Sequence, residues 1–244
     1  MNKKATLLIK NLEAIYTMEK NHQQDLVYQK GYIAIHHDTI LKIGTDDYQS
    51  LLDKDTRVLD ARGHFAIPAF VEVMGNEVAP SSYGYELSLY HLAMEYFSHG
   101  VLTIGMKHCK KEYLEVDFVP NIVKAPKDTL LADCIIKGSV KRVQKQFYLS
   151  TKANTTILYD PLLLARLLYA QKKIDPMDML RAMTCNPAKQ LGLTNIGYLK
   201  KGMQADILIC KGEQIQSLFC EFSSHSIDQI IKRGIRIYPF VIRS

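Results

Sequence analysis

Hydrophobic and polar residues alternate with a period of two along much of the first 67 residues, a pattern typical of half-buried β-strands. Residues 31–35 and 39–43 flank the short polar stretch His36-His37-Asp38. Two alternating runs around such a turn predict a β-hairpin. The runs that predict strands in this region lie at 6–9, 14–18, 31–35, 39–43, 57–60 and 65–67.

The middle of the chain has a mixed pattern. Apolar residues recur at helical spacing across 86–99, and Gly100 follows as a C-terminal cap. Asp160-Pro161 and Asp175-Pro176 each place a capping carboxylate before a proline, which predicts the start of a helix. Further strands are predicted at 101–106, within 114–123 and at 147–151.

The end of the chain returns to β-structure, with a turn and strand at 202–210 and a hairpin over 227–238 closed near Gly234. The order is therefore β, then α/β, then β. We expect residues 1–67 and 195–244 to form one composite β-sandwich domain, with an α/β domain of residues 68–194 inserted between them.

Composition is that of a globular protein, with 47% hydrophobic and 23% charged residues in 244. No run approaches the roughly 20 apolar residues of a membrane span. The apolar run at the start is too short for a secretory signal, and the five cysteines are scattered without a CxxC pair. We therefore expect a cytoplasmic protein with reduced cysteines and no membrane partner.

The net charge of +6 is concentrated in one stretch. Residues 107–152 hold ten Lys/Arg against five Asp/Glu, which leaves +5 there. A basic face can attract anions. No aromatic-basic motif accompanies these charges, so we expect a solvated face and no nucleic-acid partner.

Several motifs together resemble the amidohydrolase superfamily, and imidazolonepropionase in particular. The pair that carries most of the resemblance is Thr-x-Asn-Pro-Ala at 184–188 and Gly-x-x-x-Lys-Gly-x-x-Ala-Asp at 197–206. The stretch 60–72 is similar to the segment that leads into the first strand of that family's barrel, and 149–154 is similar to the last strand. The resemblance implies a (β/α)8, or TIM, barrel that hydrolyses C–N bonds other than peptide bonds.

Length argues against a complete barrel. Residues 68–194 number 127, whereas a (β/α)8 barrel takes about 250 residues. At roughly 30 residues per βα unit, only about four units fit. The fold class that we expect is thus α/β plus β, with an incomplete TIM-like barrel beside the composite sandwich. An open barrel exposes strand edges, which favours a homo-oligomer, most simply a dimer.

The resemblance also implies a zinc or iron ion, held by a His-x-His after the first barrel strand, by residues of central strands and by an aspartate after the last strand. The His-x-His positions are Met74 and Asn76 here, and the aspartate position is Lys152. An ammonium group repels a cation and cannot act as a carboxylate base. We therefore expect no metal cofactor and assign no catalytic residue.

The leading hypothesis is a catalytically degenerate, metal-free pseudoenzyme with a binding or assembly role. Its ligand-binding residues would be Met74, Asn76, Lys152 and Asn154, and its ligand a small anionic or heterocyclic molecule. The alternative is an active hydrolase of cyclic C–N bonds whose metal or nucleophile comes from other residues or from a partner subunit. A third hypothesis is a structural partner of a full-length relative.

Other histidines offer only weak metal candidates. His91 and His99 are eight residues apart, about 80° around a helix, so they are not placed to chelate one ion together. If a metal were found, His108, Cys109 and Glu77 would be the first residues to test as ligands.

Overall fold

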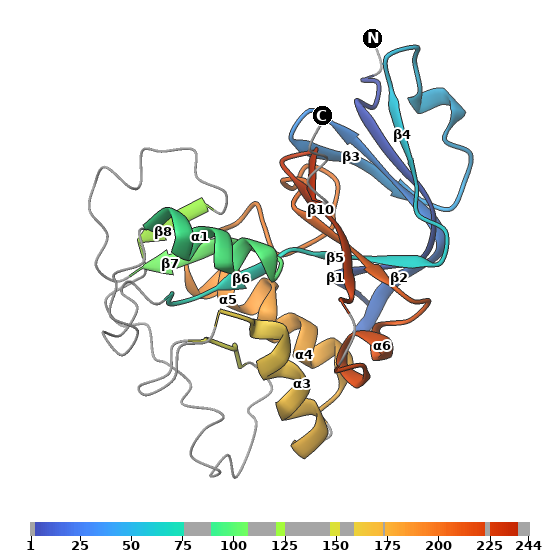
Figure 1. The fold of residues 1–244 in the computed structure, drawn as a ribbon. Coiled ribbons are helices and arrows are strands. Elements are labelled where there is room, and N and C mark those ends of the chain that lie inside the picture. The colour runs from blue at the N-terminus through green and yellow to red at the C-terminus, as the bar shows by residue number, and fades with distance from the viewer. Residues whose placement is uncertain are drawn as a thin grey trace. The chain divides into compact units, whose positions relative to one another are not determined.

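The computed structural model describes residues 3–75, 89–106, 121–124, 147–151, 159–172, 174–222 and 225–238. The chain divides into two compact units. Unit 1 consists of residues 1–69 and 195–244, and unit 2 of residues 70–194. In its described part the fold is mixed α/β, with a large β-sheet and few helices (Figure 1).

Unit 1 is built on one eight-stranded sheet in the order β11-β10-β9-β5-β1-β2-β3, with β4 paired to β1. Neighbours along this path are antiparallel except β1 and β5, which are parallel, as β1 and β4 are. The strands are β1 (Leu7–Asn21), β2 (Gln24–His36), β3 (Thr39–Gly44), β4 (Arg57–Asp60), β5 (His64–Pro68), β9 (Ile207–Lys211), β10 (Ile227–Lys232) and β11 (Ile235–Tyr238). The short helices η1 (Gln49–Leu51) and α6 (Ile215–Cys220) complete the unit.

This sheet curls over its own core, so that its two ends come into contact. Thr39 at the start of β3 forms a bridge with Gln204, and the amide of Ala205 donates to the carbonyl of Asp38 at 2.8 Å. Gly234 has φ +73°, and a Cβ added to it would lie 1.9 Å from the carbonyl oxygen of His37. The β10–β11 turn therefore lies against the β2–β3 turn.

A continuous apolar cluster fills the inside of this curl. Its members come from both ends of the chain, which explains why the first and last segments fold as one unit. The fully buried isoleucines of the cluster are Ile9, Ile15, Ile33, Ile35, Ile207, Ile209 and Ile231.

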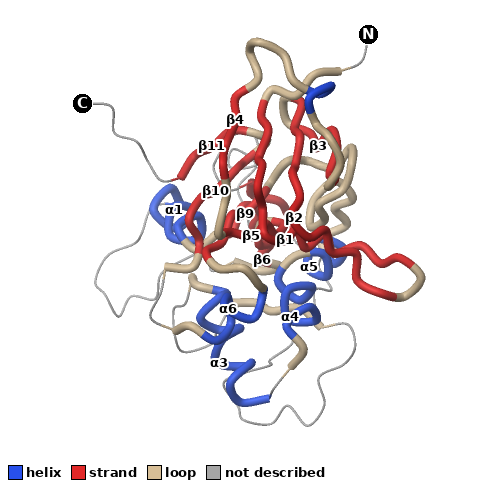
Figure 2. Tube along the Cα trace, turned by 90° about the vertical axis from the view of Figure 1, so that its right-hand side faces the viewer, coloured by secondary structure: helices blue, strands red, loops and turns tan. Residues whose placement is uncertain are grey.

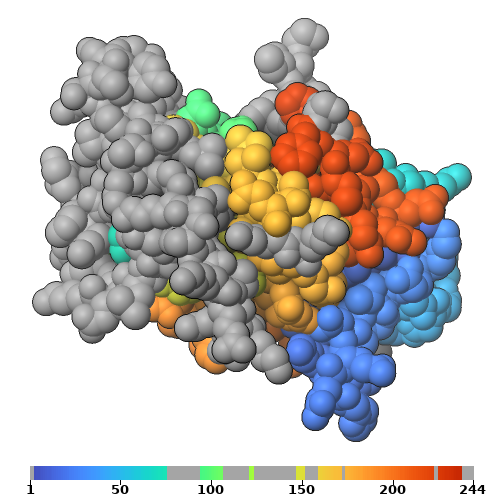
Figure 3. Space-filling view, turned by 90° about the horizontal axis from the view of Figure 1, so that it is seen from below, coloured from blue at the N-terminus to red at the C-terminus, as the bar shows by residue number. Residues whose placement is uncertain are grey.

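Strands β1 and β2 form one long antiparallel ribbon. Their pairing runs from Leu7 opposite Ile35 to Asn21 opposite Gln24, with register shifts on the way. Its exposed end stands out from unit 1 in Figures 2 and 3, where Figure 3 colours it dark blue. The polar residues after Met18, where the alternation predicts no strand, thus continue β1.

Unit 2 contains three parallel strands in its described part, in the order β6 (Phe70–Glu72), β7 (Val101–Met106) and β8 (Asn121–Lys124). The helices are α1 (Leu89–Ser98), α3 (Pro161–Lys172), α4 (Pro176–Met183) and α5 (Cys185–Gln190). Helix α1 packs against β7, while α4 and α5 pack against β6 (Figure 1).

The two predicted helix starts are confirmed. Asp175 accepts hydrogen bonds from the amides of Met177 and Asp178, and Asp160 accepts from the amides of Leu162 and Leu163. Each carboxylate thereby satisfies two N–H groups that a first helical turn leaves without a partner.

The strand predicted at 147–151 is wrong, because the segment is buried but makes no strand pairing. The amide of Leu149 donates instead to the carbonyl of Ala182 on α4 at 2.8 Å, and the Nδ2 of Asn186 donates to the carbonyl of Phe147 at 2.7 Å. Across the described helices, none is long and apolar enough to cross a membrane.

Candidate functional site

Strand β6 carries an acidic residue in an apolar environment. Its residues Phe70, Val71 and Glu72 are all buried, as expected for a parallel strand covered on both faces. Glu72 is only 1% exposed and lies at the carboxyl end of the strand. Ligands of parallel α/β folds bind at such ends, so Glu72 marks the place to look for a site.

Four hydrogen bonds hold the Glu72 carboxylate. Its Oε1 accepts from the amide of Met74 at 3.0 Å and from the hydroxyl of Ser150 at 2.7 Å. Its Oε2 accepts from the amide of Thr151 at 2.7 Å and from the hydroxyl of Thr151 at 2.6 Å. The carboxylate therefore links the end of β6 to the segment 147–151.

Helix α1 joins the same network through Tyr96. The hydroxyl oxygens of Tyr96 and Thr151 lie 2.8 Å apart, and both side chains are buried. Since the hydrogen of the Thr151 hydroxyl points to Glu72, Tyr96 is the donor to Thr151. The Tyr96 ring also packs edge-on against Tyr159, with ring centroids 5.2 Å apart.

Burial raises the pKa of Glu72 above its ordinary value, and the hydrogen bonds from Thr151, Ser150 and Met74 oppose that rise. The backbone amides of Met74 and Thr151 always donate, and one of them faces each carboxylate oxygen. Each carboxylate oxygen thus faces a backbone donor that cannot act as an acceptor.

The backbones of β6 and β7 come unusually close just beyond Glu72. The amide of Gly75 donates to the carbonyl of Gly105 at 2.8 Å. A Cβ added to Gly105 would lie 2.2 Å from the carbonyl oxygen of Val73, so this position of β7 requires glycine. Met74, between Val73 and Gly75, is 4% exposed, so its thioether belongs to the interior of unit 2.

Of the residues that the sequence predicts for ligand binding, only Met74 is among the described ones. Asn76, Lys152 and Asn154 lie outside them, as do the alternative metal candidates Glu77, His108 and Cys109. The side chain of His91 also lies outside the described parts.

His99 is placed clearly, and it contacts a helix cap. Its Nδ1 lies 3.5 Å from Oδ2 of Asp160, the residue that caps α3. This contact supports the interpretation that His99 is a structural histidine.

The described residues near Glu72 do not fit the zinc or iron that the resemblance implies. Hard or borderline ions in such sites take imidazole, thiolate or carboxylate ligands. Here the strand end offers a buried thioether, two hydroxyls and a carboxylate whose oxygens each already accept two hydrogen bonds. Across the described part of the chain, no group of three or more His, Cys, Asp or Glu side chains is placed to hold a metal.

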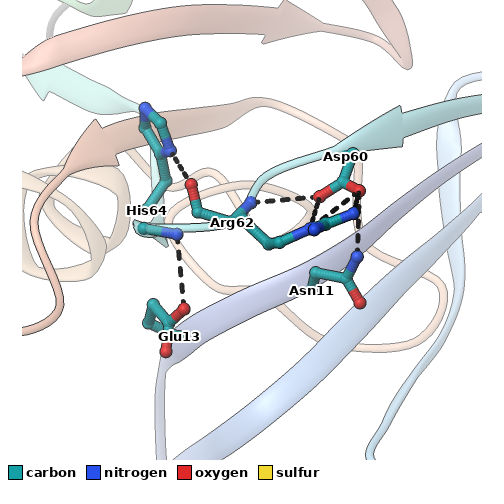
Figure 4. Close-up of polar contacts among 6 residues, drawn as sticks. Asn11, Glu13, Asp60, Arg62 and His64 are labelled. Atoms are coloured by element: carbon teal, nitrogen blue, oxygen red, sulfur yellow. Dashed lines mark hydrogen bonds and ion pairs between the residues drawn. The ribbon is translucent and has the colours of Figure 1, made fainter.

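A second polar cluster lies on unit 1, in the turn between β4 and β5. Asp60 accepts from the amide and guanidinium of Arg62 and from Asn11 at the neighbouring bend of β1 (Figure 4). Glu13 accepts from the amide of Gly63 and pairs with Lys30. The polar side chains of this cluster are mutually paired, so the cluster fixes the turn that leads into β5.

Asp206 has a comparable structural role in the same unit. Its Oδ1 accepts from the amide of Arg233 at 2.8 Å, and its Oδ2 accepts from Nε2 of Gln204 at 2.7 Å. The 6% exposed carboxylate therefore joins the start of β9 to the β10–β11 turn.

Residues 129–236 match the model of the amidohydrolase family. The matched segment includes the 147–151 segment, the helices α3 to α5, and strands β9 and β10. No curated protein matches the sequence significantly.

Solved structures share the fold. Atrazine chlorohydrolase TrzN from Arthrobacter aurescens TC1, complexed with zinc, superposes with a TM-score of 0.64 and 11% identity, covering 94% of each chain. An adenosine deaminase from Xanthomonas campestris with bound zinc gives 0.66 and 10%, covering 97% of this chain and 93% of that one.

A β-aspartyl dipeptidase from Fervidobacterium islandicum AW-1, in complex with a β-Asp-Leu dipeptide, gives a TM-score of 0.60 and 12% identity, covering 97% of each chain. At these identities the likeness shows a shared fold. It does not transfer a substrate.

Sequence reasoning missed Glu72 and Tyr96 as members of a polar network. A signal for Glu72 was present, because a glutamate inside an apolar strand must find partners to be buried. Nothing in the sequence indicated that Thr151, 79 residues away, supplies two of them.

Proposed function

We propose that the protein is an amidohydrolase-fold pseudoenzyme that binds a small anionic or heterocyclic ligand and does not perform metal-dependent hydrolysis. The observation that carries this proposal is the chemistry at the end of β6. A buried methionine stands where the resemblance implies a histidine, and the adjacent carboxylate is fully engaged in hydrogen bonds.

The ligand class follows from charge. Lys152 comes directly after Thr151, so it follows the segment that the Glu72 carboxylate holds. Together with the +5 balance of residues 107–152, this lysine favours an anionic group, and Asn154 adds an amide that can both donate and accept. A heterocycle of the imidazolonepropionase type is the substrate-like molecule that the family resemblance suggests.

The alternative is an active hydrolase of cyclic C–N bonds that holds its metal with other residues or shares it with a partner subunit. This alternative is supported by two structures of similar fold that were solved with bound zinc. Glu77, His108 and Cys109 are then the first ligands to test.

Metal content separates the two. The protein should be purified without chelators and without metal-affinity resin, and then subjected to elemental analysis before and after incubation with zinc. We expect less than about 0.1 equivalent of transition metal in both samples. About one equivalent, lost after substitution of His108 and Cys109, would overturn the pseudoenzyme proposal and establish the alternative.

Ligand binding is tested next, by calorimetric titration with small heterocyclic carboxylates. Lys152→Gln should weaken binding roughly tenfold or more, since a hydrogen bond to a charged group contributes about 1.5–3 kcal/mol. Lys189→Gln is the matched control, because Lys189 is an exposed lysine on α5 of the same unit. Equal affinity in the two variants would remove Lys152 from the site.

A further inference from the structure

We infer that the segments around Glu72 in unit 2 are held together without a metal: the Glu72 carboxylate ties the end of β6 to the segment 147–151, and through Thr151 to helix α1, by hydrogen bonds alone. The family resemblance would place one metal ligand at Met74, which follows β6, and another at Lys152, which follows the segment 147–151. The inference rests on the metal-free part of the proposed function and is independent of ligand binding.

Hydrogen-bond donors surround both oxygens of the Glu72 carboxylate. An ionised carboxylate offers about four lone-pair sites, two on each oxygen. Met74 and Ser150 occupy Oε1, and the amide and hydroxyl of Thr151 occupy Oε2. Glu72 therefore bridges parts of the chain 78 and 79 residues apart, with two donors around each carboxylate oxygen.

The network continues from Thr151 into α1 through Tyr96. Thr151 passes its hydrogen to Glu72 and accepts from Tyr96, whose side chain is fully buried. A charged acceptor at the centre strengthens both bonds in the chain. Three elements that are distant in sequence thus meet at one buried carboxylate.

Position 72 needs an oxygen acceptor on both sides, because a backbone amide donates to each carboxylate oxygen. A glutamine at position 72 would have one carbonyl and one NH2 group. Because the amides of Met74 and Thr151 face different oxygens, either orientation of the glutamine would set its NH2 against a backbone N–H. Glu72→Gln is consequently a sharp test, although it preserves size and shape.

The experiment is thermal unfolding of the full chain, followed by circular dichroism, with excess EDTA and with added zinc. We expect the wild-type Tm to change by less than about 1 °C between the two conditions. Glu72→Gln should lower the Tm by roughly 5–10 °C in both, the shift expected from losing buried hydrogen bonds to a charge. Glu95→Gln, the same change at an exposed position of α1, is the control and should leave the Tm unchanged.

Milder variants keep the test informative if Glu72→Gln does not fold. Thr151→Val removes the hydroxyl that links Glu72 to Tyr96, whereas Thr151→Ser retains it. We expect Thr151→Val to lower the Tm by roughly 3–8 °C and Thr151→Ser by clearly less. Tyr96→Phe, which removes the hydroxyl that donates to Thr151, should lie between wild type and Thr151→Val.

Two results would overturn the inference, and they can be told apart. If EDTA lowered the wild-type Tm by several degrees and zinc restored it, a metal would be structural, and the metal-free part of the proposed function would fail as well. If Glu72→Gln or, failing that, Thr151→Val were as stable as its control, the inference alone would fail. The proposed function would then be unaffected.

Discussion

At the scale of single residues, Asp60 gives unit 1 a defined response to acid. Hydrogen bonds from Arg62, and then from Asn11, lower the pKa of the Asp60 carboxyl from 3.8 to about 2. A carboxyl with a lowered folded-state pKa stabilises the fold above its unfolded pKa, and this contribution disappears as the pH falls through the folded value. The relevant window is thus from about pH 4 down to about pH 2.

Asp60→Asn should therefore be less stable than wild type at about pH 5, and the difference should shrink toward about pH 2. Urea midpoints measured at several pH values in this window would show the convergence. The control is Asp55→Asn, because Asp55 is an exposed carboxylate of the same unit whose side chain takes no part in the Asp60 cluster. Parallel curves for Asp60→Asn and wild type would contradict the prediction.

Residue-level prediction from sequence succeeded where the cause is local. Asp160 and Asp175 cap helices because a carboxylate and a following proline suit the first turn whatever surrounds it. Glu72 could be seen as unusual but not explained, since its partners Ser150 and Thr151 become neighbours only after folding. Met74 was identified from the resemblance, and its burial supports treating it as part of the interior.

At the scale of elements, the close approach of β6 and β7 depends on glycine. The hydrogen bond from Gly75 to Gly105 extends their pairing beyond the last paired residues, Glu72 and Ile104. A methyl group on Gly105 would meet the Val73 carbonyl oxygen at 2.2 Å and Leu191 Cδ2 at 2.7 Å. The strands would have to separate to accommodate it.

Gly105→Ala should cost about 1–3 kcal/mol of unfolding free energy, the usual range for overpacking a buried site. Gly75→Ala is the comparison, since its added Cβ would meet a side-chain methyl of Ile104, at 2.5 Å, and no backbone atom within 3 Å. Side chains adjust more readily than backbone, so we expect a smaller loss. Chemical denaturation of both variants measures the difference, and equal losses would show that backbone contact is not the limiting factor.

Strands were predicted correctly from the sequence where hydrophobic and polar residues alternate or where an apolar run is continuous. The hairpins β2–β3 and β10–β11 and the strand β7 lie where alternation or an apolar run predicts them. The full length of the β1–β2 ribbon and the conformation of the segment 147–151 could not be predicted in this way. Polar residues at an exposed ribbon end carry no periodic signal, and the apolar residues of 147–151 are buried against α4 without pairing in a sheet.

At the scale of the whole molecule, the shared fold and the side chains at the site give different information about function. The motifs at 184–188 and 197–206 led to a superfamily, and both the matched segment 129–236 and the solved neighbours agree with that fold. A fold hosts many activities, whereas an activity depends on particular side chains at one site. The identity of Met74, Asn76 and Lys152 therefore bears more directly on function than the shared fold does.

We expect the protein to associate with a second copy of itself. Residues 68–194 have room for only about four βα units, and within the described ranges β8 pairs with β7 alone. Strand edges of this kind are commonly covered by a second copy, and symmetric dimers are the commonest assemblies. We therefore expect sedimentation velocity at micromolar concentration to give twice the 27.8 kDa of one chain. A monomer under these conditions would mean that the chain covers its own edges, and the dimer would have to be abandoned.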